Sequence, residues 1–219
     1  MPMDATSRTP CLTTGEPLPH IGMWLTLDFS LEQMVGDVAS TIRRLVNDPN
    51  KASNRPVDTT ADRNRLCLEG VYKEMAFDRL WRLYPSCVLD TRLRSVANGT
   101  DRGDTLIFGK TVDVKGTEHI DGHLLPQPTA TGHVDCFALM VGVFPRYKFC
   151  GFIETASLLR PDRIRDWGKH PTWGAPQSHL KEFVDLDWTI PWHPMPPAEQ
   201  IRQFKQRTLS DCQAALINY

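Results

Sequence analysis

Apolar residues recur with helical spacing in two segments that a polar stretch separates. Between residues 31 and 46 the spacing of three and four predicts an amphipathic helix, which Ser30 can cap. Its apolar stripe consists of Leu31, Met34, Val38, Ile42 and Leu45. A second helix is predicted over residues 61–84, because Pro85 follows it. The residues between the two, 48–60, are expected to form a linker.

The second predicted helix carries an acidic residue within its apolar stripe. At about 100° per residue, Glu74 falls in the arc of the apolar face. That face holds Leu66, Gly70, Phe77, Trp81 and Tyr84. A carboxylate near a core needs a cation, a proton or a polar partner. Glu74 is therefore either a candidate metal ligand or a residue at the rim of the stripe that pairs with Arg or Lys, and Glu69 on the flank is a rival candidate.

A loop rich in turn formers is followed by two short alternating segments, which predict a β-hairpin. The segments are residues 105–108 and 111–115, with Gly109-Lys110 as the expected two-residue turn. Because side chains alternate along a strand, Asp113 and Lys115 share one face.

Asp104 is expected to join this pair. With the turn at residues 109 and 110, Asp104 lies across from Lys115 and diagonal to Asp113, and diagonal neighbours are about 7–8 Å apart. Two carboxylates and an ammonium then converge, which suits the binding of Mg²⁺ and the cleavage of a phosphodiester. The alternative is an exposed strand whose ion pair contributes little.

Composition narrows the class of protein. The 219 residues, 41% of them hydrophobic, are enough for one domain with extensions. The sequence shows neither a signal peptide nor eighteen consecutive apolar residues, so we expect a cytoplasmic protein with no membrane segment. The six cysteines lack a Cys-x-x-Cys pair and are interpreted as reduced thiols. A net charge of -1 implies that any contact with nucleic acid is local.

The order of these features resembles the PD-(D/E)xK nuclease superfamily, and in more detail its phage-type nuclease domains. The matching segments are Gly70-Val71-Tyr72-Lys73-Glu74-Met75-Ala76-Phe77, Gly103-Asp104, Val112-Asp113-Val114-Lys115-Gly116-Thr117, Gly122-His123-Leu124-Leu125, an apolar strand over 135–143 and an edge strand ending Gly151-Phe152-Ile153. The resemblance covers about residues 62–165. One departure is Lys73, where phage-type domains usually carry a glycine.

The resemblance implies an α/β fold with a restriction-endonuclease-like mixed β-sheet flanked by helices. Residues 61–185 would form this domain, residues 1–60 an N-terminal arm and helical extension, and residues 186–219 a Pro/Trp-rich connector and a C-terminal helix. The apolar spacing of the C-terminal helix indicates docking, either on the domain or in a homodimer.

The resemblance also implies a function. Glu74, Asp104 and Asp113 would hold Mg²⁺ or Mn²⁺, and Lys115 would assist hydrolysis of a phosphodiester, with DNA as the expected substrate in a bacterial or phage-infected cell. The alternative is a catalytically inactive nuclease-fold module that binds nucleic acid or serves as a phage structural protein.

Further contacts with nucleic acid are expected from basic and polar side chains outside the metal site. These are Lys73, His123, Gln127, Arg160, Arg163, Arg165 and Lys169. In the Pro/Gly-rich segment 160–179, Trp167 and Trp173 alternate with these cations and are candidates for base stacking. The alternative is that both tryptophans simply pack.

Overall fold

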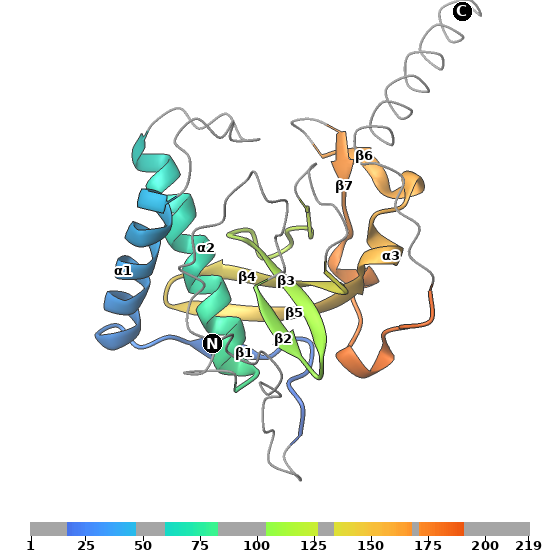
Figure 1. Cartoon of the computed structure of the whole chain (residues 1–219), viewed down its shortest axis with the longest axis horizontal. Helices are drawn as coiled ribbons and strands as arrows, with labels where there is room; N and C mark the ends of the chain where they lie inside the picture. Colours follow the sequence, from blue (N-terminus) through green and yellow to red (C-terminus); the bar gives the residue numbers. More distant parts are fainter. Residues whose placement is uncertain (1–16, 47–59, 83–103, 127–133, 168–170, 191–219) are drawn as a thin grey trace, which may run out of the picture.

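The structure is a computed structural model that describes residues 17–46, 60–82, 104–126, 134–167 and 171–190 (Figure 1). Its elements are β1 (Trp24–Thr26), α1 (Leu31–Val46), α2 (Thr60–Leu80), β2 (Thr105–Ile107), β3 (Lys110–Thr117), β4 (Cys136–Val143), β5 (Arg146–Glu154), α3 (Thr155–Leu158), η2 (Pro161–Arg163), β6 (Ile164–Asp166), β7 (Pro171–Trp173), η3 (Gln177–His179) and η4 (Phe183–Asp185). The two helices predicted from periodicity are confirmed. Gln127, Lys169 and the expected C-terminal helix lie outside the described residues.

A five-stranded mixed sheet forms the centre of the fold. Its strand order is β1-β5-β4-β3-β2, with β3 parallel to β4 and the other neighbouring pairs antiparallel. The continuous apolar run of β4 suits a strand that is buried on both faces. The prediction of an edge strand ending at Ile153 is wrong, because β5 lies between β4 and β1. The short β1 pairs only with the beginning of β5, at Arg146–Lys148.

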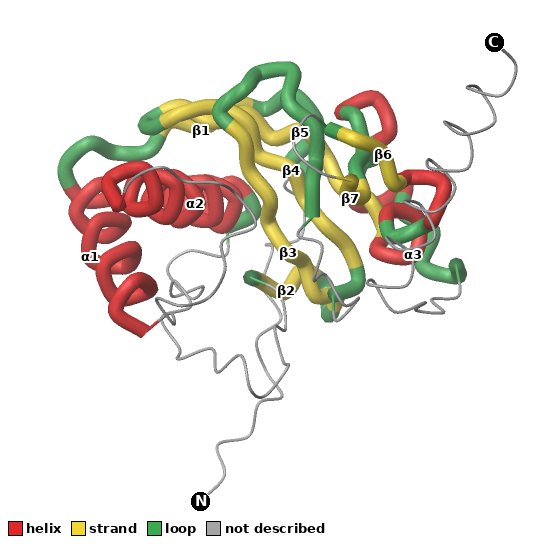
Figure 2. The backbone as a smooth tube through the Cα atoms, turned by 90° about the horizontal axis from the view of Figure 1, so that it is seen from above, coloured by secondary structure: helices red, strands yellow, loops and turns green. Residues whose placement is uncertain are grey.

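Both faces of the sheet are covered. Figure 2 shows α1 and α2 on one side of the sheet and α3, β6 and β7 on the other. Alternate residues of β4 divide between two buried clusters: Ala138 and Met140 belong to the cluster beneath α2, and Phe137 and Leu139 to the cluster beneath the segment that follows β5. The expected α/β class is thus found as a mixed sheet between two layers. Within the described ranges, no helix is both long enough and apolar enough to span a bilayer.

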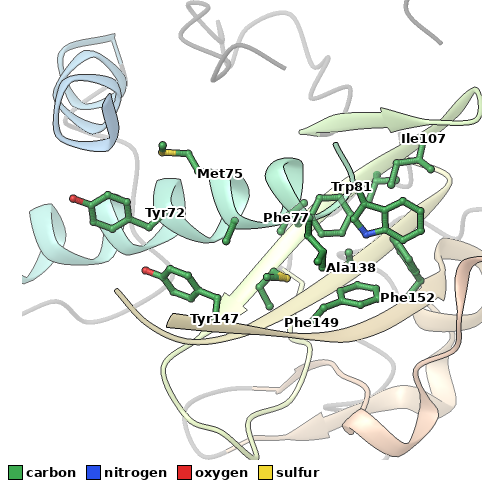
Figure 3. Close-up of a cluster of buried hydrophobic side chains, with 14 of the residues drawn as sticks. Tyr72, Met75, Phe77, Trp81, Ile107, Ala138, Tyr147, Phe149 and Phe152 are labelled. Atoms are coloured by element: carbon green, nitrogen blue, oxygen red, sulfur yellow. The ribbon is translucent and has the colours of Figure 1, made fainter. Parts of the chain in front are cut away.

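Aromatic side chains dominate the core between α2 and the sheet. Phe77 of α2 and Trp81, which directly follows the helix, point toward Phe149 and Phe152 of β5 (Figure 3). Trp81 is 1% exposed, and its ring centroid lies 5.3 Å from that of Phe152 in an edge-to-face arrangement. Burial of rings of this size is the main favourable contribution to a core. It holds α2 on the sheet, and with it the residues that α2 presents at the sheet's edge.

The predicted apolar stripe of α1 does not face the described core. Leu31, Met34 and Val38 are each more than half exposed, whereas Ala39 is buried. α1 packs on α2 through small residues: Gly36 lies so close to the Tyr72 ring that a Cβ there would be 2.2 Å from its Cε1 atom. The predicted cap is also revised, because the Asp28 carboxylate, and not Ser30, accepts hydrogen bonds from the first N–H groups of the helix. Those donors are Ser30 and Leu31.

The turn of the predicted hairpin lies one residue earlier than expected. Ile107 pairs with Lys110, so the central residues of the turn are Phe108 and Gly109. Both have positive φ, 45° and 78°, as a type I′ hairpin turn requires. Glycine satisfies this requirement at the second central position. The shift keeps every side chain on its predicted face, but it changes the partner across the hairpin for Asp104.

Candidate active site

Asp113 and Lys115 lie together on one face of β3. The Lys115 Nζ atom is 2.6 Å from Asp113 Oδ2 and 2.8 Å from Oδ1. Their side chains are 25% and 17% exposed for the lysine and the aspartate, so the pair is partly removed from solvent. In the parallel register they stand beside Leu139 and Phe137, which places them on the face of the sheet opposite α2.

Asp104 directly precedes β2 and reaches the same pair. Its N–H donates to the Val112 carbonyl at 2.8 Å, and its Oδ2 atom accepts the Val114 N–H at 2.8 Å. Since Thr105 pairs with Val112, the register differs from the expected one, in which Asp104 lay across from Lys115. The Asp104 carboxylate lies close enough to Asp113 to influence its ionisation.

The surroundings raise the pKa values of both Asp113 and Lys115. Burial raises the pKa of Asp113 well above its ordinary range, the nearby Asp104 raises it further, and Lys115 opposes the shift. Burial alone would lower the pKa of Lys115, but the Asp113 and Asp104 carboxylates outweigh it, so the pKa is raised. Lys115 therefore remains an ammonium, whereas the charge of Asp104 disfavours ionisation of Asp113.

Glu74 approaches the same cluster from α2. It is half-buried at the margin of the helix's buried face, which agrees with the alternative of a position at the rim of the stripe. Its carboxylate is among the charges that raise the pKa of Lys115. The rival candidate Glu69 is engaged elsewhere: its Oε2 atom accepts hydrogen bonds from the Lys73 ammonium at 2.8 Å and the Tyr147 hydroxyl at 3.2 Å.

The carboxylate oxygens of this cluster are the kind of ligand that a hard divalent cation prefers, although they are not arranged in a coordination shell. Among the described residues, no three His, Cys, Asp or Glu side chains form a group arranged to hold a metal ion. However, the Asp104 carboxylate raises the pKa of Asp113, and a divalent cation bound to both carboxylates would offset this repulsion. The chemistry of Asp104 and Asp113 thus fits Mg²⁺ or Mn²⁺. Glu74 is a third carboxylate close enough to raise the pKa of Lys115.

Lys73 occupies a place that its sequence position does not predict. Its side chain is 4% exposed, and its ammonium pairs with Glu69. The buried ammonium is therefore not accessible to a phosphate in solvent, and the structure does not support the predicted contact of Lys73 with nucleic acid. The lysine is instead part of the packing between α2 and β3.

The basic segment after β5 lies on the same side of the sheet as Asp113 and Lys115. Arg160 is exposed and pairs with Asp162 at 3.0 Å, Arg163 contacts the His179 ring nitrogen at 3.1 Å, and Arg165 is exposed on β6. Within the described part of the segment, Arg165 is the arginine whose side chain forms neither a hydrogen bond nor an ion pair.

The two tryptophans of this segment differ. Trp173 is fully buried, so the expectation that it stacks on a base is wrong. Trp167 packs on Gly174 and on the ring of His123, whose centroid is 4.8 Å away. The Trp167 indole N–H donates to the Thr172 carbonyl at 3.1 Å, which fixes the ring. His123 remains exposed on this platform.

Two positioning contacts near the site involve side chains that are distant in sequence. The Asp135 carboxylate accepts hydrogen bonds from the N–H and hydroxyl of Thr111, both at 2.8 Å, and aligns β4 with β3. The Gln177 amide donates to the Ile120 and Gly122 carbonyls at 2.7 and 3.0 Å, and holds the loop after β3. For Gln177 the sequence offers no signal, because the contact spans more than fifty residues.

Comparisons of the chain with protein-family models, with curated proteins and with solved structures found no match. The case for a function therefore rests on the side chains themselves. They form a half-buried cluster with two neighbouring carboxylates, an ammonium beside them and a third carboxylate at the margin.

Proposed function

We propose that this protein is a metal-dependent nuclease that hydrolyses phosphodiester bonds, with DNA as the expected substrate, on a restriction-endonuclease-like core of the PD-(D/E)xK type. The observation that carries the proposal is the convergence of Asp104, Asp113 and Lys115 at the β2–β3 hairpin, with the Asp104 carboxylate bonded to the Val114 N–H and the ammonium 2.6 Å from Asp113. The order of helix, hairpin and strand supports the choice of fold.

The charge of the cluster favours a divalent cation. Asp104, Asp113 and Glu74 carry three negative charges when ionised and Lys115 one positive charge, which leaves a formal excess of two negative charges. Mg²⁺ or Mn²⁺ would supply a Lewis acid that lowers the pKa of water and offsets charge on the phosphate. Asp104 and Asp113 hold the cation, and Glu74 is the candidate third ligand.

Lys115 acts next to the reacting phosphate. Its raised pKa keeps it protonated, so it serves as a hydrogen-bond donor and a fixed positive charge. An ammonium held by Asp113 can orient the attacking water or stabilise negative charge that develops in the transition state. Both roles need the charge, and an alanine supplies neither.

The side of the sheet that bears the site also offers groups for substrate. Arg165 and His123 are exposed there, and His123 is braced by Trp167. Cations of this kind contact phosphates and make binding depend on salt. The near-neutral net charge of -1 agrees with a local contact of this type.

Digestion of plasmid and single-stranded DNA, with Mg²⁺ or Mn²⁺ and then with chelator, tests the proposal. The wild-type protein is expected to cut only with metal, and Lys115→Ala to lose at least about 10²-fold in rate. Lys110→Ala is the matched control, because Lys110 lies on the same strand but pairs with Asp135 at 3.7 Å.

Three results count against the proposal. Cutting that persists in chelator, cutting that Lys115→Ala leaves intact, or equal losses in both lysine variants each contradict it. DNA binding without cutting under every metal condition identifies the inactive nuclease-fold alternative instead.

A further inference from the structure

α2 touches β3 through a lysine that lies on a glycine. The Lys73 side chain crosses Gly116 so closely that a Cβ at Gly116 would be 2.0 Å from the Lys73 Cδ atom and 3.0 Å from Cε. Gly116 is not among the glycines with positive φ, so its backbone does not require glycine. The absent side chain matters because it makes room for the lysine.

Lys73 is not free to move aside. Its ammonium lies 2.8 Å from Glu69 Oε2 and 5.4 Å from the centre of the Tyr147 ring. The Tyr147 hydroxyl donates to the same carboxylate oxygen at 3.2 Å. We name Glu69, Lys73 and Tyr147 the lysine clamp. Buried charged groups that are fully paired fix one arrangement of their surroundings, since other arrangements leave a charge unpaired.

The two residues in contact each adjoin a residue of the proposed active site. Glu74 follows Lys73 on the helix, and Lys115 precedes Gly116 on the strand. A helix is stiff over a single residue, so a shift of α2 at Lys73 carries Glu74 with it. The separation of helix and strand at this contact therefore sets the distance between the Glu74 carboxylate and the Lys115 cluster.

We propose that Lys73 and Gly116 are positioning residues, whose close contact, held by the lysine clamp, places Glu74 at the active site. The inference rests on the proposed function and deepens it. It also gives a physical reason for a buried lysine directly before the acidic residue.

The expected size of the effect follows from the distances. Carbon atoms in contact are about 3.5–4.0 Å apart, so an alanine at position 116, with its Cβ 2.0 Å from Cδ, requires the lysine or the helix to give by more than 1 Å. Displacement of a reacting group by about 1 Å can lower a rate by on the order of 10²-fold. Gly116→Ala is therefore expected to lower the single-turnover cutting rate by about 10²-fold and to weaken Mn²⁺ binding, measured by isothermal titration calorimetry, with little change in KM for DNA.

A change of background tests whether the loss passes through Lys73. The Glu69→Gln/Lys73→Ala protein lacks the lysine. Its second substitution, Glu69→Gln, removes the carboxylate that would otherwise lose its ion pair. Adding Gly116→Ala to that protein is expected to change the rate and the Mn²⁺ affinity by no more than about twofold, because the effects of residues in contact are not additive. An equal loss in both backgrounds contradicts a role for the contact.

Gly36→Ala is the matched control for the packing defect. Its Cβ would lie 2.2 Å from the Tyr72 ring, a comparable clash that falls at the contact of α2 with α1 and not at the contact of α2 with β3. Both variants are expected to lower the melting temperature, and only Gly116→Ala is expected to weaken Mn²⁺ binding. Equal Mn²⁺ affinities in the two variants overturn the inference.

A second variant, Glu69→Gln/Lys73→Met, keeps the volume of the clamp, removes its charges and serves if Gly116→Ala does not fold. It is expected to cut about tenfold more slowly than the wild type, a loss equivalent to about 1.4 kcal/mol in the barrier; a wild-type rate contradicts the inference. If the wild type neither binds Mn²⁺ nor cuts, the proposed function fails together with the inference. If the wild type cuts and Lys115→Ala does not, the proposed function stands whatever Gly116→Ala does.

Discussion

Replacing Asp113 by asparagine is expected to stabilise the metal-free protein while it abolishes cutting. Burial and the neighbouring Asp104 raise the pKa of Asp113, so ionising Asp113 near neutral pH disfavours the folded state. Each unit of this rise costs about 1.4 kcal/mol once the group is ionised. An asparagine has no charge to desolvate, and its amide can donate to Asp104 where the carboxyl needs a proton.

The substitution also has an opposing loss. Asparagine gives up the ion pair with Lys115, whose two side chains are 25% and 17% exposed, and pairs with this much contact to solvent contribute at most about 1 kcal/mol. Lys115 retains the charges of Asp104 and Glu74. Because burial raises the pKa of Asp113 well above its ordinary range, we expect a net gain in the free energy of unfolding, and for a chain of this size each kcal/mol raises the melting temperature by about 2–4 °C.

The pH dependence has a definite sign. The folded-state pKa of Asp113 is raised, so its favourable contribution is present below its ordinary value of 3.8 and is lost as the pH rises through the folded-state value. The advantage of Asp113→Asn is therefore absent at low pH and largest at alkaline pH. Circular dichroism melts in chelator at acidic and alkaline pH measure both values.

Asp135→Asn is the matched control on the adjacent strand. The Asp135 carboxylate accepts two hydrogen bonds from Thr111, both at 2.8 Å, and asparagine weakens these charge-assisted bonds by about 1–2 kcal/mol. The two substitutions should thus have opposite signs. The reasoning is refuted if Asp113→Asn lowers the melting temperature in chelator at alkaline pH, or if Mg²⁺ stabilises Asp113→Asn as much as it stabilises the wild type.

Two further outcomes are expected. Trp81→Ala removes a ring that is 1% exposed and should cost about 3–5 kcal/mol in the free energy of unfolding, measured by urea denaturation; a cost below 1 kcal/mol contradicts the assigned core. Arg165→Ala should weaken DNA binding for all sequences and reduce the slope of log K against log salt by about 1, measured by fluorescence anisotropy, whereas Arg160→Ala, already paired with Asp162, should change it less. Equal slopes for wild type and Arg165→Ala would exclude this contact.

The parts of the site that depend on local geometry could be predicted from sequence. Asp113 and Lys115 share a face because side chains alternate along any strand, whatever the turn. The partner of Asp104 could not be predicted with the same security, because it depends on which residue begins the turn. Phe108 takes a positive φ there, which its residue type does not favour.

The orientation of α1 and the clamp at Lys73 depend on contacts distant in sequence. Periodicity favours burial of the large apolar stripe, but close approach to Tyr72 at Gly36 and the ion pair of Glu32 with Arg79 favour the opposite face. Helical spacing cannot reveal that Gly116 makes room for Lys73, because the two residues meet only in the folded chain.

The lysine clamp and the Lys115 cluster are two networks of acids and amines on opposite faces of the same sheet. They differ in net charge, and this difference indicates a structural role for the first and a metal-binding role for the second. In the clamp one carboxylate meets one ammonium and a hydroxyl donor, so the network is neutral and its hydrogen bonds are satisfied. In the Lys115 cluster the carboxylates outnumber the ammonium, and Asp104 raises the pKa of Asp113. A balanced network fixes an arrangement without a ligand, whereas an acidic excess is destabilising until a cation joins it. Metal should therefore stabilise the wild type and do little for Asp113→Asn, and neutralising the clamp should loosen the site without creating a new demand for metal.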